Sequence, residues 1–131
     1  MVEPLVSVLM TSYNREKYIA NAIKSVLKSD YKNFELIIVD DRSKDKTVDI
    51  ANSFAALDSR IKVFINAENL GDYPNRNRAA SYATGTYLKY VDADDYIYPW
   101  GLTIMVNAMQ QFPDAGWGLC SLEQDISRPF P

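Results

Sequence analysis

Three carboxylates stand within four residues of one another, at Asp92, Asp94 and Asp95. They follow an apolar and aromatic run at residues 87–91 that is typical of a β-strand, and aspartate is a poor strand former. The three side chains are therefore expected on the turn that leaves the carboxyl end of this strand. Like charges this close repel one another, and oxygen ligands suit Mg2+, Mn2+ or Ca2+. The turn is expected to hold one divalent cation with an anionic ligand on its far side; the alternative is a solvated acidic turn that caps the next helix.

The composition narrows the chemistry that the chain can perform. The 131 residues include no histidine and one cysteine, so acid–base chemistry falls to carboxylates, tyrosine or lysine, and a metal site must be all-oxygen. The net charge of -3 argues against a nucleic-acid-binding surface, which needs a basic face. The sequence shows neither a signal-peptide pattern nor the ~20 consecutive apolar residues that span a bilayer.

Strand-like and helix-like stretches alternate along the chain. Apolar runs predict four strands and a candidate fifth, at residues 5–11, 34–39, 61–65, 87–91 and 117–122. Apolar residues at helical spacing predict helices at residues 15–28, 74–84 and 99–111, and another that follows Ser43. Asn14 and Ser43 are expected to be helix N-caps, and Gly85 a helix C-terminal stop.

This alternation predicts an α/β fold with one open, mostly parallel sheet, right-handed crossovers and helices on both faces. Residues 1–122 are expected to form this domain and residues 123–131 an irregular tail. Ligands of such sheets bind beyond the carboxyl ends of the strands, where the strand order reverses. With the strands in the order 3-2-1-4, three polar segments meet there, at residues 11–14, 40–41 and 92–95.

The first polar segment limits the kind of ligand. Residues 11–18 contain no glycine, whereas dinucleotide-binding turns and P-loops need several. Phosphate charge must then be met in another way, and the acidic turn with a bound metal offers one. Tyr13 is placed to stack on a nucleobase, and Asp41 to accept hydrogen bonds from a base or a ribose. The alternatives are that Tyr13 packs over the sheet edge and that Asp40 and Asp41 only cap the following helix.

Three motifs of the chain resemble those of family 2 glycosyltransferases, which have the GT-A fold. They are residues 6–15 (VSVLMTSYNR), 34–43 (FELIIVDDRS) and 87–95 (YLKYVDADD). The resemblance extends to residues 31–33 and covers residues 5–122 in order. It also takes in Asn69, Gly71, Arg76, Asn77 and Ala79.

The resemblance implies a site for a nucleotide diphosphate sugar, with a UDP-sugar as the first choice and Mn2+ or Mg2+ as the cofactor. Asp92 and Asp94 correspond to the DxD motif, with Asp94 as the direct metal ligand and Asp95 as a further one. The residues implied in donor binding are Thr11, Tyr13, Asn14, Asp41, Arg76, Arg78 and Asp92. For the two arginines, solvated helix surface is the alternative.

The resemblance also implies what the whole enzyme does. It would transfer the sugar, with inversion, to a hydroxyl of a glycan or lipid-linked acceptor. The expected setting is polysaccharide biosynthesis in the cytoplasm, at the cytoplasmic face of a membrane with which the parent protein associates.

The sequence departs from the family in its length. Family members continue well beyond this point, into a half that supplies the acceptor pocket and the catalytic base. The chain is therefore expected to be an N-terminal donor-binding half whose base lies outside it, and neither Glu123 nor Asp125 is assigned that role. Two other classes are considered. One is a non-catalytic nucleotide-binding module; the other, a receiver-like signalling domain, is disfavoured because residues 117–131 contain no lysine.

Overall fold

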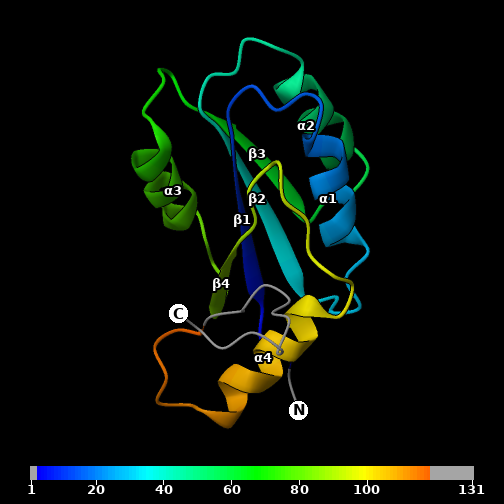
Figure 1. The fold of residues 1–131 in the computed structure, drawn as a ribbon, viewed down its shortest axis with the longest axis vertical. Coiled ribbons are helices and arrows are strands. Elements are labelled where there is room, and N and C mark those ends of the chain that lie inside the picture. The colour runs from blue at the N-terminus through cyan, green and yellow to red at the C-terminus, as the bar shows by residue number, and fades with distance from the viewer. Residues whose placement is uncertain (1–2, 119–131) are drawn as a thin grey trace, which may run out of the picture.

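One open sheet of four parallel strands forms the centre of the molecule (Figure 1). The computed structural model describes residues 3–118. The strands are β1 (Val6–Ser12), β2 (Phe34–Asp40), β3 (Ile61–Ile65) and β4 (Tyr87–Tyr90). They lie in the order β3-β2-β1-β4 with every neighbouring pair parallel, which confirms the predicted order. Most of the candidate fifth strand lies outside the described residues, and its first two residues are not in a strand.

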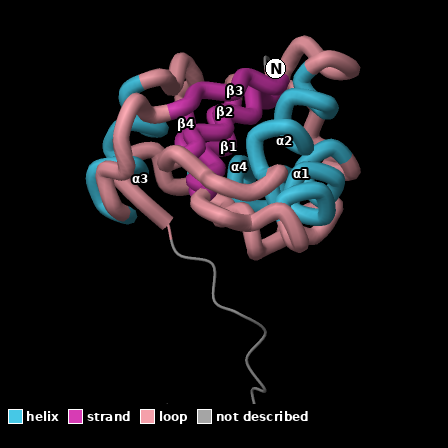
Figure 2. Tube along the Cα trace, turned by 90° about the horizontal axis from the view of Figure 1, so that it is seen from above, coloured by secondary structure: helices cyan, strands magenta, loops and turns pink. Residues whose placement is uncertain are grey.

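Helices cover both faces of the sheet, as predicted. They are α1 (Ile19–Leu27), α2 (Thr47–Ala55), α3 (Asp72–Ser81) and α4 (Gly101–Gln111). Seen from above, the strands lie between α3 on one side and α1 with α2 on the other (Figure 2). Helix α4 lies near the amino ends of the strands (Figure 1). Within residues 3–118 no helix has the length and apolar character that crossing a membrane requires.

The strand side chains divide between two cores because successive residues of a strand point to opposite faces. Val8, Met10 and Ile38 belong to the larger core, which α1, α2 and α4 close. Leu9 and Ile37 belong to a smaller core, which α3 closes. Every residue of β2 is buried, since β2 has a strand on each side and helices over both faces. This double covering explains why residues 34–39 are apolar except for Glu35.

Two predicted helix starts are wrong. Helix α1 begins at Ile19 rather than residue 15, and α2 begins at Thr47; neither has a side-chain cap. Asn14 has a φ of 51°, in the left-handed region, and its side chain accepts a hydrogen bond from the backbone N–H of Lys44 at 2.8 Å. Ser43 Oγ in turn accepts from the Asn14 backbone N–H at 2.8 Å. These residues tie the turns after β1 and β2 to each other, so they do not cap helices.

Gly85 is not the helix stop that its position suggested, because α3 ends at Ser81. It lies instead where the segment before β4 crosses the start of β1. Its N–H donates to Ser7 Oγ at 2.8 Å. A Cβ at this position would meet Leu5 O, Ser7 N and Ser7 Oγ, each at 2.7 Å. Only glycine allows the backbones to approach this closely.

We therefore expect Gly85→Ala to lower the free energy of unfolding by about 1–3 kcal/mol, the usual cost of forcing an extra carbon into a packed site. Urea denaturation followed by circular dichroism measures this change. Gly116→Ala is the matched control, because a Cβ there would meet nothing within 4 Å. Equal stabilities of the two variants would show that the crossing is not tight.

Candidate functional site

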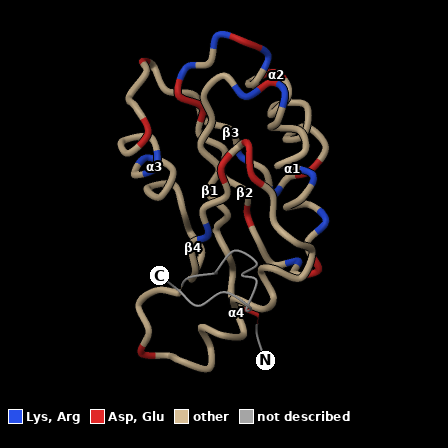
Figure 3. Tube along the Cα trace, viewed as in Figure 1, with Lys and Arg blue, Asp and Glu red and all other residues tan. Residues whose placement is uncertain are grey.

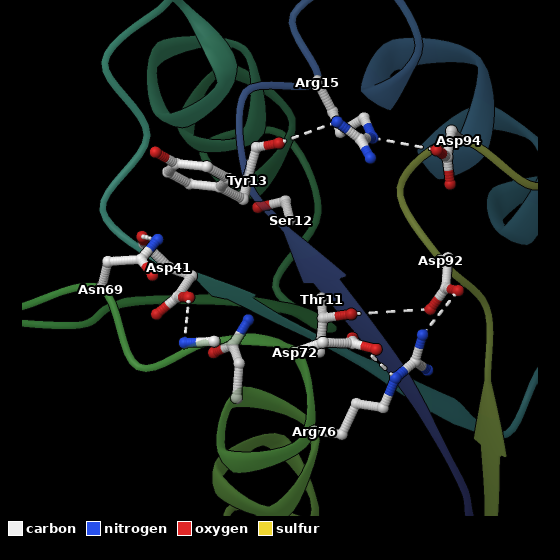
Figure 4. Close-up of a pocket in the computed structure, with 12 residues that line it drawn as sticks. Thr11, Ser12, Tyr13, Arg15, Asp41, Asn69, Asp72, Arg76, Asp92 and Asp94 are labelled. Atoms are coloured by element: carbon white, nitrogen blue, oxygen red, sulfur yellow. Dashed lines mark hydrogen bonds and ion pairs between the residues drawn. The ribbon is translucent and has the colours of Figure 1, made fainter.

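The carboxyl ends of β1, β2 and β4 border one pocket of about 410 Å3 (Figure 4). The N-terminal turn of α3 closes its remaining side. The pocket lies at the edge that the topology predicts, where the strand order reverses between β1 and β4. Its lining residues are Thr11, Ser12, Tyr13, Arg15, Asp41, Asn69, Gly71, Asp72, Asn75, Arg76, Asp92 and Asp94.

The pocket brings together six of the nine side chains that the sequence analysis assigned to donor or metal binding. These six are Thr11, Tyr13, Asp41, Arg76, Asp92 and Asp94. Three others lie outside the lining. Asn14 is held by the turn after β2, and the exposed Arg78 donates from Nε to the Tyr82 hydroxyl at 3.3 Å. Asp95 is exposed on the acidic turn.

The acidic turn leaves β4 beside the end of β1. The backbone N–H of Val91 donates to Leu9 O at 2.9 Å, and both Val91 and Ala93 are buried. The backbone N–H of Asp95 donates to Asp92 O at 2.9 Å and closes the turn. Asp92 and Asp94 line the pocket, whereas Val91 and Ala93 pack into the core.

The three carboxylates of this turn are close enough to share a cation. One oxygen from each of Asp92, Asp94 and Asp95 lies within 4.8 Å of the others. The donor set is all-oxygen and partly exposed, which fits Mg2+ or Mn2+.

Two arginines from elsewhere in the chain partly neutralise this turn. Arg15 Nε lies 2.9 Å from Asp94 Oδ2, and Arg76 Nη2 lies 2.7 Å from Asp92 Oδ2. Arg76 also contacts Asp72, with 2.9 Å between Nε and Oδ1. The hydrogen bond with Asp92 is the main cause that raises the pKa of Arg76. Arg76 is therefore an ion-paired residue of the pocket wall rather than solvated helix surface.

Charge decides which ligands this pocket can accept. Its lining holds four carboxylates and two guanidinium groups. An anion such as a diphosphate meets net repulsion in such a lining, whereas a divalent cation is attracted and can then bring an anion with it. The arrangement suits a metal–anion pair better than either an anion or a neutral ligand alone.

Asp41 is engaged by the protein itself. Its side chain is buried, and Oδ1 accepts hydrogen bonds from Asn66 Nδ2 at 2.8 Å and Leu70 N at 2.7 Å. Oδ2 accepts from Gly71 N at 2.9 Å. Gly71 has a φ of 87°, which glycine adopts readily, and directly precedes α3. Asp41 thus anchors the loop that leads into α3, and through it the position of Arg76.

Asp41→Asn should weaken this anchor. The amide keeps one acceptor oxygen but turns an N–H group toward backbone N–H donors, so we expect a loss of about 1–2 kcal/mol of stability. Faster hydrogen exchange at the Leu70 and Gly71 amides would locate the effect in the loop. Asp72→Asn is the control, because the Asp72 side chain is exposed and its ion pair is an i,i+4 surface pair. Unchanged exchange in Asp41→Asn would contradict the anchoring role.

Arg15, Asp72 and Asn75 line the pocket although the sequence analysis gave them no role. Asn75 is buried and donates to Val39 O at 3.1 Å while accepting from Asn66 Nδ2 at 2.8 Å. The only feature of the sequence that could have indicated Arg15 is the acidic turn, because three carboxylates need a positive charge nearby. A metal ion was inferred as that charge instead of Arg15.

Comparison with known proteins identifies the class. The profile of the family described as Glycosyl transferase family 2 matches residues 7–122. TarS of Staphylococcus aureus, in its complex with UDP-GlcNAc, superposes with a TM-score of 0.76 at 33% identity, over 81% of this chain and 31% of that one. The mannosyltransferase PcManGT of Pyrobaculum calidifontis, in complex with GDP-Man and Mn2+, shares the fold with a TM-score of 0.76 at 24% identity, over 82% of this chain and 33% of that one. The fold is the GT-A fold, and the chain belongs to glycosyl transferase family 2.

Curated relatives agree with this assignment. A Haemophilus influenzae protein named as an uncharacterized glycosyltransferase is 36% identical over 124 residues, which are 92% of this chain and 50% of that protein. The Escherichia coli UDP-Glc:alpha-D-GlcNAc-diphosphoundecaprenol beta-1,3-glucosyltransferase WfgD is 43% identical over 95 residues, or 72% of this chain and 37% of that protein. The chain thus spans half the length of these relatives, or less.

Proposed function

We propose that the chain is the donor-binding portion of a metal-dependent glycosyltransferase. It binds a nucleotide diphosphate sugar, whose sugar is transferred to an acceptor hydroxyl. The observation that carries this proposal is the meeting of the acidic turn, Tyr13 and Arg76 in one pocket at the switch point of a GT-A sheet.

The lining residues divide the donor between them. Tyr13 is 41% exposed, so its ring is available to stack on the nucleobase at the rim of the pocket. Thr11 lies beside Asp92, to which its hydroxyl donates at 3.5 Å. We assign Thr11 to the base pocket and Asp92 to the ribose. Arg76, fixed by its two carboxylate partners, faces the diphosphate.

Asp94, with Asp92 and Asp95, is the proposed holder of Mn2+ or Mg2+. Within the described part of the chain, Arg15 and Arg76 each contact only Oδ2 of their partner on this turn, so Asp94 Oδ1 and Asp95 are available to bind a cation. A bound divalent cation supplies Lewis-acid stabilisation of the charge that develops on the leaving diphosphate. The charge of the lining supports this assignment, since the carboxylates outnumber the guanidinium groups.

The reaction proposed for the whole enzyme is a displacement at the anomeric carbon. The acceptor oxygen forms a bond to this carbon, the bond from the carbon to the diphosphate oxygen breaks, and its electron pair leaves with the nucleoside diphosphate. The acceptor proton passes to a base that we place outside residues 1–122, the proposed donor-binding domain, and outside the tail at residues 123–131. A single displacement of this kind inverts the anomeric centre.

The choice of donor and acceptor is supported by the relatives. TarS forms a complex with UDP-GlcNAc, and the name of WfgD specifies UDP-Glc and a diphosphoundecaprenol-linked acceptor. We therefore propose a UDP-sugar as the donor and a glycan or lipid-linked glycan as the acceptor. Action at the cytoplasmic face of a membrane, in polysaccharide biosynthesis, follows from such an acceptor.

Titration of the chain with UDP, GDP, CDP and dTDP, each with and without Mn2+, tests donor binding. We expect UDP to bind best and only weakly without the metal. Release of free sugar from the matching nucleotide sugar then separates an enzyme from a non-catalytic binding module, which would bind the donor without cleaving it. If no nucleotide binds with Mn2+ present, the proposal is wrong.

A further inference from the structure

We propose that Arg15 is a second diphosphate-binding residue, which contacts the phosphate through its Nη2 group while its Nε holds Asp94. The inference rests on the proposed function, since it assumes a diphosphate in the pocket. The motifs of the sequence assigned no ligand to Arg15, and the structure is the source of this role.

The position of Arg15 is fixed at both ends. Its backbone N–H donates to Thr47 Oγ1 at 2.7 Å, which holds the main chain against the start of α2. Its Nη1 donates to the backbone oxygens of Tyr13 and Asn14, at 3.0 and 3.3 Å. Its Nε donates to Asp94 Oδ2 at 2.9 Å. Figure 4 shows the guanidinium between the turn after β1 and the acidic turn.

These contacts leave the Nη2 group of Arg15 for a ligand. Guanidinium carries five N–H donors, and the contacts above engage Nε and Nη1. Within residues 3–118 no hydrogen bond joins Nη2 to another group of the protein. Arg15 lines the pocket and its side chain is 42% exposed, so Nη2 is accessible from the cavity. A planar guanidinium suits the oxygens of a phosphate.

Of the two arginines that line the pocket, Arg15 is the less neutralised by carboxylates. Arg76, the other lining arginine, contacts two carboxylates, Asp72 and Asp92. Among residues 3–118, Arg15 contacts one carboxylate, that of Asp94. Neutralisation of Arg76 is therefore more complete, and an incoming diphosphate is attracted more strongly by Arg15.

This assignment predicts opposite effects on two ligands. A positive charge beside Asp94 repels a divalent cation that arrives without a phosphate, but it attracts the diphosphate of a metal–nucleotide complex. Removing the charge should therefore favour the bare metal and disfavour the nucleotide. A residue that only oriented Asp94 would behave differently, because its loss would weaken both ligands together.

The test compares the wild-type chain with Arg15→Gln, Arg15→Lys and the control Lys24→Gln, which removes one positive charge from the exposed face of α1. Electron paramagnetic resonance measures the affinity for Mn2+ alone, and calorimetry measures the affinity for UDP at saturating Mn2+. In Arg15→Gln we expect UDP to bind about tenfold more weakly and Mn2+ alone to bind up to about fivefold more tightly. Arg15→Lys should keep part of the UDP affinity, and Lys24→Gln should match the wild type in both measurements.

Two results would overturn the inference. One is an unchanged UDP affinity in Arg15→Gln; the other is a parallel loss of Mn2+ and UDP affinity, which would make Arg15 an orienting partner of Asp94 only. Both differ from failure of the proposed function, in which the wild-type chain itself would not bind UDP.

Discussion

Asp94→Asn is expected to remove the dependence of UDP binding on Mn2+. The amide preserves the shape of the side chain and can still accept the hydrogen bond from Arg15 Nε, but it lacks the negative charge that a divalent cation needs. We expect UDP affinity in the presence of Mn2+ to fall by up to about 100-fold, toward the metal-free value. Calorimetric titration of UDP with and without Mn2+ measures this difference directly.

The control for this experiment is Asp114→Asn. Asp114 is exposed and follows α4 in the chain. Helix α4 lies at the other end of the sheet from the acidic turn after β4 (Figure 3). The loss of Asp114 changes the net charge by the same amount, so general electrostatic effects appear in both variants. If Mn2+ strengthened UDP binding as much in Asp94→Asn as in the wild type, Asp94 could not be the principal metal ligand.

Glu35→Gln is expected to lower the free energy of unfolding by about 3 kcal/mol at pH 7, as its pKa shift implies. Glu35 is a buried carboxylate of β2 that accepts hydrogen bonds from Ser7 Oγ at 2.6 Å, Lys62 Nζ at 2.9 Å and Thr84 N at 2.8 Å. Burial by itself would raise the pKa of Glu35, but these hydrogen bonds outweigh it and lower the pKa from 4.5 to about 2. The amide loses the charge that these donors stabilise.

The same pKa shift sets the pH dependence of the fold. Because the pKa of Glu35 is lower in the folded than in the unfolded chain, its contribution is complete above about pH 4.5 and disappears as the pH falls toward 2. Urea denaturation at several pH values should show a steeper acid loss of stability in the wild type than in Glu35→Gln. Glu68→Gln, at an exposed position, should follow the wild type. Parallel pH profiles for wild type and Glu35→Gln would contradict this role.

The sheet was predictable because its signal is local. Each strand is a largely apolar run, and the run at residues 61–65 coincides with β3. The helix starts were not predictable, because Asn14 and Ser43 hydrogen-bond across 29 residues of sequence instead of to their own helices. Capping rules consider only neighbouring residues, so they cannot anticipate a contact of this kind.

In the site, too, features with a local sequence signal were predictable, and contacts between distant residues were not. The predicted strand order, with the residue types at the strand ends, correctly placed Tyr13 and the acidic turn in one pocket. The counter-charges did not follow from any local pattern, since Arg15 and Asp94 are 79 residues apart. The three donors to Asp41 likewise come from residues 66–71, a loop whose course the sequence does not specify.

The central claim is that a metal held by the acidic turn brings a nucleotide diphosphate into this pocket. Paramagnetic broadening by Mn2+ in the 1H–15N spectrum of the chain with saturating UDP tests it most directly. We predict that the amide signals lost first belong to residues 11–15, 71–76 and 92–95, which surround the pocket, and that Asp94→Asn restores them. Broadening centred on another part of the chain, or an unchanged pattern in Asp94→Asn, would contradict the claim.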